Sequence, residues 1–592
     1  MGELHFASIG VLPSIPDSLT IPQFQLDLAT STDRPARPSG TSCFIDDLSG
    51  KQVYLEEVRE RTQGLANALS SLYSIGEDDV VLLFSRNHLD YPIAIWAAHR
   101  VGAIVSPANP DFTRQELEYQ LKATKAKLLI AHPDVLNVAI PAAQAYGLAP
   151  DRILIFDALN NAVSKFVNVD SLVERGLRTS KAFLERRLKR GEGKTKLAFL
   201  SFSSGTTGTP KAVAIPHIAV IANVLQLAAH SRINEEYGDW NDRRYRPGDT
   251  AIGVLPFYHI YGLVVNLHFL LYCGMSIVIV PKFNFEGMLK SIVRHKITHL
   301  MIVPPQAVLL CKHPAVKKYD LSGIRYIMIG AAPLSDEVNE RLFKLFPDAH
   351  IGQGYGMTET CTVISIWSIE RKRGISGSAG QLIPGVVARI LKSDGTLGGY
   401  GDVGELVVKA PSNALGYFNN PQATQETFVD GFVRTGDEVR VAPDGELRII
   451  DRIKEIMKVR GFQVAPAELE GTLLCVLVSC NKAAGTHHLS RDHPDISDAC
   501  VVGVPDDYSG EVPLAFVVLT ADAAGRAERN PHDLKTIRVS ILKHVADLKI
   551  GYKHLAGGVE FVDSIPKNPS GKLLRRVLRE RAKELKTTKA KL

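Results

Sequence analysis

The sequence has few of the features that would assign it at once to a class of protein. Its 592 residues include only seven cysteines and no Cys-x-x-Cys pair, which argues against a disulfide framework and fits a reducing compartment. The 69 basic and 63 acidic residues leave a net charge of +6. This small surplus comes without a basic motif interleaved with aromatic residues, so we expect no nucleic-acid partner. Internal repeats and long low-complexity segments are also absent.

Targeting and membrane signals are equally weak. The opening MGELHFASIG lacks the basic and apolar segments of a secretory signal, and Phe6 stands where a myristoylation motif needs serine or threonine. Residues 262–280 are the most apolar stretch, but Asn266, His268 and Gly274 interrupt it. We expect a buried helix, a turn at Gly274 and a buried strand there, and no transmembrane segment.

Short apolar runs alternate with amphipathic stretches, which predicts an α/β fold. Helical patterns at 89–102 and 113–125 separate some of these runs, and turns of the DG and GG type between about 377 and 450 predict a small antiparallel β subdomain. The runs themselves are typical of parallel-sheet strands buried on both faces: VVLLF (80–84), AIVSP (103–107), KLLIA (127–131), RILIF (152–156) and SIVIV (276–280).

A change in composition near residues 451–462 indicates a domain boundary. Charge rises there, a glycine interrupts the pattern, and a new alternation of helix and strand starts at PAELEGTLL. We expect a large N-terminal domain over 1–452 and a smaller α+β domain over 453–592.

The segment SFSSGTTGTPKAVAIPH, residues 201–217, combines small residues, hydroxyls and a lysine in a way that suits a phosphate group. It is not a P-loop, because Gly205 and Gly208 are too close together and Pro210 precedes Lys211. From these residues alone, a phosphate-binding loop and a flexible polar turn both stay open.

Four more stretches extend this pattern: LPFYHIYGL (255–263), GQGYGMTET (352–360), RTGDEVRVAPDGELRIIDRIKEIMKVRGFQVAPAELE (434–470) and PKNPSGKLLRR (566–576). With SSGTTGTPK, and in this order, they make the chain from about residue 50 to 585 resemble the acyl-adenylate-forming superfamily, within it the 4-coumarate–CoA ligases and related acyl-CoA ligases. The resemblance implies that a carboxylic acid attacks the α-phosphate of ATP to give acyl-AMP and pyrophosphate. Coenzyme A (CoA) then displaces AMP, after a mobile C-terminal domain has rotated.

The resemblance also assigns residues to the nucleotide. Glu359 would ligate Mg²⁺, a hard cation that prefers oxygen ligands, Thr358 would bond the α-phosphate, and Tyr355 would stack under adenine. Asp437 would accept both ribose hydroxyls with Arg452 beside it, although such a pair is ordinarily a surface ion pair of little value. The full set assigned to ATP or AMP is Ser203, Ser204, Gly205, Thr206, Thr207, Lys211, Gln353, Gly354, Tyr355, Thr358, Asp437, Arg452, Lys454, Lys458, Gln463 and Lys572.

By the same resemblance, the C-terminal domain and the hinge would supply most of the residues for catalysis and CoA binding, and the large domain would supply Lys282. Lys572 would be the catalytic lysine of adenylation, since its charge offsets the repulsion between the two reacting anions, and Lys454 would be the hinge residue. CoA would be bound by Lys282, Arg460 and Gly461, where Arg460 replaces the lysine more common in the family.

The acid pocket is less well specified by the resemblance. His259 would gate the substrate and is the second catalytic candidate, and Val265 replaces a small polar residue common in coumarate enzymes, which favours hydrophobic acids. The residues assigned to the acid are His259, Tyr261, Val265, Met328, Gly330, Ala331, Gly354, Val363 and Ile366.

One stretch departs from the family pattern. CVLVSCNKAAGTHHLSR, residues 475–491, separates PAELEGTLL from HPDISDACVVGVPD. Its cysteines and histidines lack zinc-finger spacing, so a surface loop is preferred to a metal site. Seventeen codons are 51 nucleotides, so an in-frame retained intron is an alternative that transcript sequencing would test.

The sequence thus predicts an ATP-dependent, Mg²⁺-requiring acyl-CoA ligase acting on an aromatic or medium-to-long hydrophobic carboxylic acid. Two alternatives are an adenylating enzyme that loads a carrier protein in trans or oxidises like a luciferase, and a non-catalytic binder of nucleotide or acyl groups. The final Ala590-Lys591-Leu592 resembles the peroxisomal Ser-Lys-Leu signal. We therefore expect a peroxisomal import receptor as partner, with the cytoplasm as the alternative location.

Overall fold

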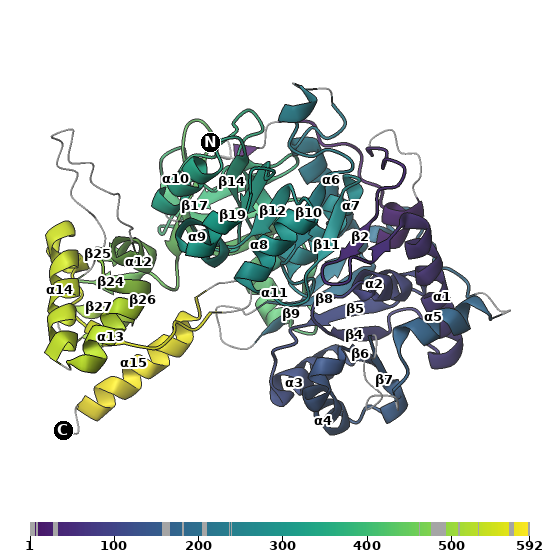
Figure 1. Ribbon diagram of the computed structural model, residues 1–592, viewed down its shortest axis with the longest axis horizontal. Helices are drawn as coiled ribbons and strands as arrows, with labels where there is room; N and C mark the ends of the chain where they lie inside the picture. Colours follow the sequence, from purple (N-terminus) through teal and green to yellow (C-terminus); the bar gives the residue numbers. More distant parts are fainter. Residues whose placement is uncertain are drawn as a thin grey trace.

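Three sheets are built from residues up to Arg452 and a fourth from residues after it (Figure 1). We call the described residues up to Arg452 the large module and those from Met457 the C-terminal module; Ile453–Ile456 form the joint. The computed structural model describes residues 6–7, 10–27, 34–156, 166–179, 183–203, 210–235, 237, 239–334, 336–460, 462–474, 493–506, 509–530, 532–567 and 573–589.

The largest sheet has nine strands and a parallel centre. Its outermost pairs, β14 with β15, β15 with β16 and β2 with β3, are antiparallel, and the remaining pairs are parallel. In spatial order the strands are β16 (Gln381–Leu382), β15 (Thr362–Ile366), β14 (His350–Met357), β13 (Tyr326–Ile329), β12 (His299–Ile302), β10 (Thr250–Gly253), β11 (Ser276–Ile279), β2 (Phe44–Asp46) and β3 (Gln52–Val53).

A second sheet of seven strands is parallel from β8 to β7, and β9 and β20 add an antiparallel edge. Its order is β20 (Gly416–Tyr417), β9 (Lys211–Pro216), β8 (Leu197–Ser203), β5 (Ile104–Ala108), β4 (Val80–Phe84), β6 (Leu128–Ala131) and β7 (Ile153–Ile155). The predicted apolar runs coincide with β4, β5, β6, β7 and β11 to within one residue at each end.

Burial on both faces explains the apolar character of these strands. In β4, Val81 and Leu83 join the central core, whereas Val80, Leu82 and Phe84 join a core on the other face. Because successive side chains of a strand point to opposite faces, a strand between two cores must be apolar at every position. The predicted α/β fold is therefore confirmed.

Helices fill the space around both sheets. The central core contains residues of α1, α2, α5, α6 and the helix η7. The core on the outer face of the nine-stranded sheet contains residues of α8, α9 and α10. The core on the outer face of the seven-stranded sheet contains residues of α3 and α4. Their bounds are α1 (Leu55–Tyr73), α2 (Tyr91–Arg100), α3 (Arg114–Thr124), α4 (Leu136–Tyr146), α5 (Val169–Leu177), α6 (His217–His230), η7 (Tyr261–Phe269), α8 (Phe285–Arg294), α9 (Pro304–Lys312) and α10 (Asp336–Leu345).

The apolar stretch 262–280 folds as the sequence predicts, into buried helix, turn and buried strand. The π-helix η7 continues into α7 (Leu270–Tyr272), Gly274 turns the chain with a φ of +73°, and β11 follows. A φ in the left-handed region is accessible to glycine without strain. No helix among the described residues is long and apolar enough to cross a membrane.

The third sheet is antiparallel and lies in the region where the sequence has its DG and GG turns. The N-terminal β1 (Phe6–Ala7) pairs with its edge. The other strands are β17 (Val387–Leu391), β18 (Leu397–Gly398), β19 (Val403–Lys409), β21 (Phe428–Val429), β22 (Phe432–Val441) and β23 (Leu447–Arg452), and α11 (Pro421–Thr427) precedes β21.

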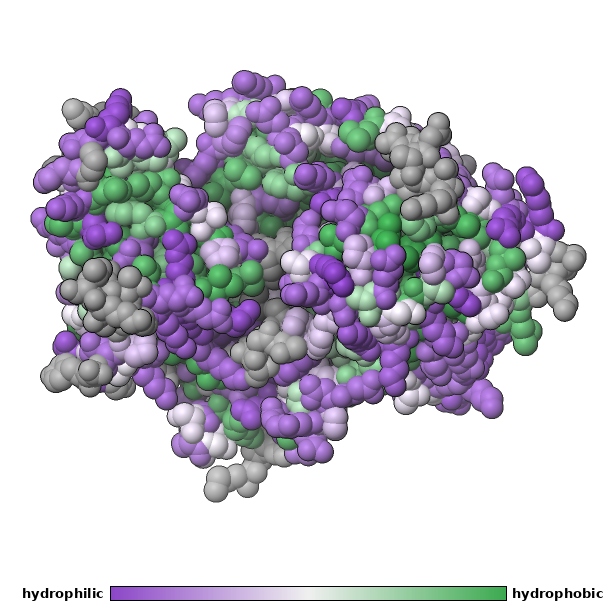
Figure 2. All heavy atoms as spheres, turned by 90° about the horizontal axis from the view of Figure 1, so that it is seen from below, coloured by the Kyte–Doolittle hydropathy of each residue, from purple (hydrophilic) through white to green (hydrophobic). Residues whose placement is uncertain are grey.

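The C-terminal module has its own sheet and two small cores. Figure 1 shows it, from α12 to α15, set beside the large module, and Figure 2 shows a furrow between the two parts with hydrophilic side chains along its edges. Its elements are β24 (Met457–Val459), β25 (Phe462–Val464), α12 (Pro466–Leu474), β26 (Ile496–Asp506), β27 (Gly510–Leu519), α13 (Ala521–Arg529), α14 (His532–Leu548), β28 (Gly558–Phe561) and α15 (Arg575–Lys589).

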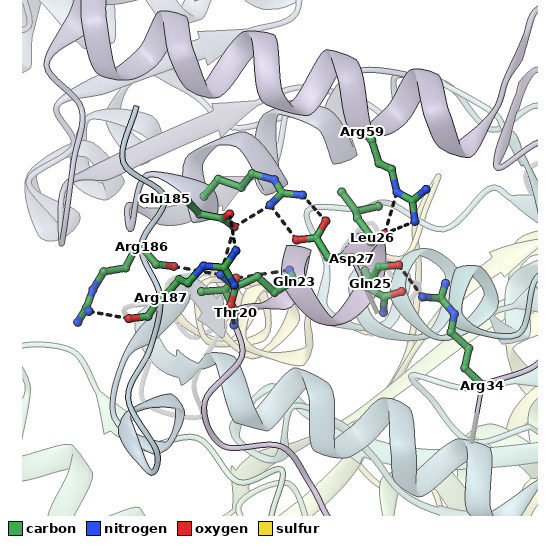
Figure 3. Close-up of polar contacts among 11 residues, drawn as sticks. Thr20, Gln23, Gln25, Leu26, Asp27, Arg34, Arg59, Glu185, Arg186 and Arg187 are labelled. Carbon is green, nitrogen blue, oxygen red and sulfur yellow. Dashed lines mark hydrogen bonds and ion pairs between the residues drawn. The ribbon is translucent and has the colours of Figure 1, made fainter. Parts of the chain in front are cut away.

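A polar network fixes the N-terminal segment against the helices of the large module (Figure 3). The short helix η1 (Gln23–Asp27) lies at its centre: Asp27 accepts from Arg100 at 2.7 Å and Arg59 donates to the carbonyl of Leu26. Gln25 donates to the carbonyl of His268 in η7 at 3.0 Å, and its own carbonyl accepts from Arg34. These bonds tie the segment to α1, α2 and η7.

Candidate functional site

A cavity of about 630 Å³ lies where the two parallel sheets and the antiparallel sheet meet. It is lined from the end of β8, the start of β9, the segment before η7, β13, β14, and the ends of β22 and β23. Fourteen of the predicted residues line it: Ser203, Lys211, His259, Tyr261, Met328, Gly330, Ala331, Gly354, Tyr355, Thr358, Glu359, Val363, Arg452 and Lys454.

At one end of the cavity, a carboxylate and a lysine lie close to the segment predicted to bind phosphate. Ser203 and Lys211 face each other across the β8–β9 pair, so both strands deliver their polar residues to one place. The Ser203 hydroxyl donates to Glu359 at 2.8 Å, and Glu359 is buried. The Lys211 ammonium lies 4.9 Å from the centre of the Tyr417 ring. This end therefore combines an anionic group with hydroxyls and a cation, as a metal–phosphate site requires.

A buried polar triad lies beside it. Asp437 and Arg452 are register partners in the β22–β23 pair, and their side chains form an ion pair of 3.1 Å. The hydroxyl of Tyr355 donates to the other oxygen of Asp437 at 2.6 Å. Asp437 is only 4% exposed, so the pair is not the surface ion pair that the sequence left open. Burial, reinforced by the charge of Asp437, raises the pKa of Tyr355 well above its usual value and keeps this phenol a donor.

The opposite end of the cavity is apolar and closely fitted. The Tyr261 hydroxyl donates to the carbonyl of Met328 at 3.2 Å, which fixes the ring against β13. Gly354 on β14 faces Met328, and a Cβ at Gly354 would come within 2.5 Å of the terminal methyl of that methionine. Ala331 adopts a φ of +72°, which is rare for a residue with a side chain and turns the chain at the end of β13. Small residues here leave space for a substrate.

Comparisons with known proteins agree with this geometry. A family model described as AMP-binding enzyme matches residues 32–418, and one described as AMP-binding enzyme C-terminal domain matches residues 490–572. The chain belongs to the AMP-binding enzyme family.

Its relatives include 4-coumarate–CoA ligase 2 of Oryza sativa subsp. japonica, 33% identical over 586 residues that cover 96% of this chain and 94% of that protein. Acyl-CoA ligase AFT1-1 of Alternaria alternata is 33% identical over 600 residues, covering 96% of this chain and 95% of that protein. ATP-bound MatB from Rhodopseudomonas palustris has a similar structure, with a TM-score of 0.77, 25% identity and coverage of 96% of this chain and all of that one. The predicted family and the predicted class, an AMP-forming acid–thiol ligase, are confirmed.

Several residues assigned by resemblance to this family lie away from the cavity wall. Val265 is fully buried within η7, and Ile366, 1% exposed, lies on β15 as the register partner of Gly354. The amide oxygen of Gln353 accepts from the backbone N–H of Leu334, which orders the chain after β13. None of the three lines the cavity, so each shapes the wall from behind rather than touching its contents.

The residues predicted to bind CoA are distributed over both modules. Lys282 follows β11 in the large module, and Arg460, with a φ of +50°, turns the chain after β24 and donates its backbone N–H to Ser509. Two residues predicted to bind ATP or AMP lie close to Arg460 in the chain: the backbone N–H of Lys458 donates to Glu511 at 2.9 Å, and Gln463 is its register partner in β25. None of these residues lines the cavity.

Other predictions fall on residues outside the described ranges. These are Ser204, Gly205, Thr206 and Thr207 of the phosphate segment, Gly461, Lys572, the insertion 475–491 and the tail Ala590–Leu592. Among the described residues no cluster of three or more potential metal ligands occurs.

Sequence reasoning missed two supporting residues. The Tyr417 hydroxyl donates to Glu359 at 2.9 Å, but GYFNN carries no motif that would reveal it. Glu405 binds Arg434 and accepts from the backbone N–H of Gly436 at 3.2 Å, which orders the turn before Asp437. A signal was present there, because a glutamate in the otherwise apolar strand GELVV must find a buried partner.

Proposed function

We propose that this protein is an ATP-dependent acyl-CoA ligase that activates an aromatic or medium-to-long hydrophobic carboxylic acid through its adenylate. The observation that carries the proposal is one cavity with two ends of opposite character. The Ser203–Glu359–Lys211 end suits a metal-bound phosphate, the Asp437 triad suits a ribose, and the Tyr261–Met328 end is apolar. ATP and the acid would therefore meet in the middle.

Adenylation joins two anions, so the site must supply positive charge. Lys211 would contact the terminal phosphates, and Lys572 would touch the acid carboxylate and the α-phosphate together. Glu359 would hold Mg²⁺, whose chemistry when bound is to neutralise phosphate charge. The buried Glu359 carboxylate, which already accepts from Ser203 and Tyr417, has the oxygen donors that this ion prefers.

Ribose recognition follows from the buried triad. An ionised carboxylate has about four acceptor positions, so Asp437 can accept from Tyr355 and Arg452 and still accept from two ribose hydroxyls. The bonds from Arg452 and Tyr355 hold the Asp437 carboxylate in a fixed orientation for this purpose. The ring of Tyr355 would then lie under adenine.

Thioester formation needs a second arrangement of the modules. Rotation at Lys454 would withdraw Lys572 and bring Arg460 and Gly461 toward Lys282, so that the pantetheine arm of CoA can enter. Gly461 would leave room for that arm because it has no side chain.

The acid class follows from the apolar end of the cavity. His259 would gate the entrance, and Met328, Gly330, Ala331 and Val363 would surround a flat ring or a slender chain.

A panel of acids tests the proposal. Incubation with ATP, Mg²⁺, CoA and cinnamic, benzoic and C6–C16 fatty acids should give acyl-CoA, AMP and pyrophosphate from at least one acid. Acyl-AMP without acyl-CoA would support carrier loading or oxidation instead, and neither product would support a non-catalytic binder. Omission of Mg²⁺ should abolish product, and activity retained in EDTA would refute the assignment of Glu359.

We further propose that the tail Ala590-Lys591-Leu592 directs the protein to peroxisomes, because it differs from Ser-Lys-Leu by one small residue. A fluorescent protein fused to the N-terminus should give punctate signal that becomes diffuse when the three residues are removed. Diffuse signal from the intact fusion would contradict the proposal and favour the cytoplasm.

A further inference from the structure

The joint between the modules is held by contacts on both sides of Lys454. Before it, the backbone N–H of Ile453 donates to the carbonyl of Gly436 in β22 at 3.0 Å, so the chain is still part of the large module. After it, the carboxylate of Glu455 pairs with Arg575, and Arg579 donates to the carbonyl of Lys454 at 3.4 Å. The last residues of the joint are therefore bonded to the first turns of α15.

Arg575 lies at the centre of these contacts. Its guanidinium binds Glu470 on α12 through two bonds, Nε to Oε1 at 3.2 Å and Nη2 to Oε2 at 2.7 Å, and binds Glu455 through its remaining nitrogen, Nη1. The side chain is only 11% exposed. A planar guanidinium can bind two carboxylates in this way, whereas the ammonium of a lysine cannot. We call these three bonds of Arg575, two to Glu470 and one to Glu455, the fork.

The partners of Arg575 are themselves fixed. Glu470 is buried and accepts from the backbone N–H of Val501 in β26 at 2.8 Å. Asp451, at the end of β23, is buried nearby and accepts from the backbone N–H of Ala467 in α12 at 3.0 Å. Burial raises the pKa of Asp451, and the charge of Arg575 opposes that change. One cation thus balances three carboxylates from the joint, α12 and β23.

Both ends of the segment that carries Lys572 are anchored within the C-terminal module. Lys567 pairs with Asp498 on β26 at 2.6 Å, and the backbone N–H of Leu574 donates to the carbonyl of Pro566 at 2.9 Å. Lys567 and Leu573 are bridge partners. The paired residues Lys567 and Leu573 form the base of the segment that carries Lys572. Arg575 follows Leu573 by two residues, so its ion pair with Glu455 connects this base to the joint.

We propose that Arg575 is a positioning residue for adenylation: bound to Glu455 and Glu470, it makes the joint, α12 and the base of the Lys572 segment a single body. This inference rests on the proposed function, because it takes Lys572 as the lysine of the first half-reaction. When the modules rotate, Lys572 would arrive at an orientation set by this fork. Loss of the fork leaves the lysine present but misplaced, and a misplacement of about 1 Å can cost about 10²-fold in rate.

The test separates the half-reactions in the full-length protein. Arg575→Lys keeps the charge and removes the fork, and Glu470→Gln keeps an acceptor for the Val501 N–H while it removes the carboxylate. Each should lower kcat for acid-dependent pyrophosphate release by about 10- to 100-fold, with KM for ATP and acid unchanged. Transfer of the acyl group from supplied acyl-AMP to CoA should stay within about twofold of the unaltered rate.

Arg576→Ala is the matched control, since the neighbouring Arg576 is exposed and forms an ion pair with Glu580 on the same helix at 2.9 Å. It should leave both half-reactions unchanged. Thermal unfolding of every variant establishes that it is folded. Equal slowing of both half-reactions by Arg575→Lys, or no slowing of either, would overturn the inference. If Lys572→Ala also fails to slow adenylation selectively, the fault lies in the proposed function and not in the role of Arg575.

Discussion

The two modules stabilise their functional residues in different ways. In the large module, residues at or beside the cavity lie on strands between extensive cores, and they pair with side chains of neighbouring strands, as Asp437 does with Arg452. In the C-terminal module the cores are small and the contacts with the joint are ionic, centred on Arg575. We propose a corresponding division of labour: the large module would fix where ligands bind, and the C-terminal module would select the half-reaction. Variants at the ribose site of the large module should then affect both half-reactions, and variants around Arg575 and Lys572 only adenylation.

The largest effect is expected from Lys572→Ala. Removal of one positioned charge from a site where two anions react costs about 10²–10³ in rate, and only adenylation joins two anions. Pyrophosphate release should therefore fall by that factor, whereas CoA-dependent consumption of supplied acyl-AMP should be nearly unchanged. Comparable slowing of both steps would remove the distinction between the modules.

Asp437→Asn should have the next largest effect, and on both half-reactions. The variant keeps the volume but loses charge-assisted bonds to Arg452 and the ribose, each worth about 1.5–3 kcal/mol. KM for ATP and for supplied acyl-AMP should each rise by about 10- to 100-fold, since both carry the ribose. Steady-state kinetics check this, and Asp444→Asn, on an exposed turn, is the control. A rise in KM for ATP without a rise in KM for acyl-AMP would contradict a shared ribose site.

A smaller effect is expected from Gly354→Ala. The added methyl would lie 2.5 Å from the flexible end of Met328, so that side chain must shift into the apolar end of the cavity. We expect activity with the bulkiest accepted acids to fall by about tenfold relative to the smallest, with KM for ATP unchanged. Competition between two acids of different size measures the selectivity. An equal loss for all acids would mean that Gly354 supports the fold and not the pocket.

The last and smallest expected effect concerns thermal stability, and it is confined to acidic pH. It comes from buried histidines of the large module. Burial lowers the pKa of His230, His268 and His299 to about 4. Between pH 6.5 and about 4 the unfolded chain binds these protons and the native protein does not, so stability falls as pH falls through this range. Calorimetry from pH 7.5 to 4.5 should show a falling Tm whose slope is reduced in His268→Gln. His532→Gln, at an exposed position, should leave the slope unchanged.

Much of this organisation could be predicted from the sequence, because local patterns determine it. Runs such as VVLLF are apolar at every position since both faces are buried, and the Gly-rich GQGYGMTET coincides with the end of β14 at the cavity. The helix at 113–125 could be placed to within a residue because Thr113 and Glu116 form a capping box.

What the sequence could not show are contacts between segments far apart in the chain. Tyr417 reaches Glu359 across 58 positions, and Arg575 reaches Glu455 across 120. Neither contact is indicated by a periodic pattern or a local motif in the sequence. Val265 and Ile366 were assigned to the pocket by their position in motifs, but whether a side chain touches the cavity or supports its wall depends on the helix and sheet behind it.

The N-terminal segment shows that the folded unit is larger than the family match. The match begins at residue 32, whereas Gln25, which satisfies the carbonyl of His268, and Asp27, which pairs with Arg100, precede it. A chain trimmed to the match would leave a carbonyl of η7 and the buried guanidinium of Arg100 without these partners, and losses of this kind cost about 1–3 kcal/mol each. The residues that precede the family match thus contribute to the stability of the large module.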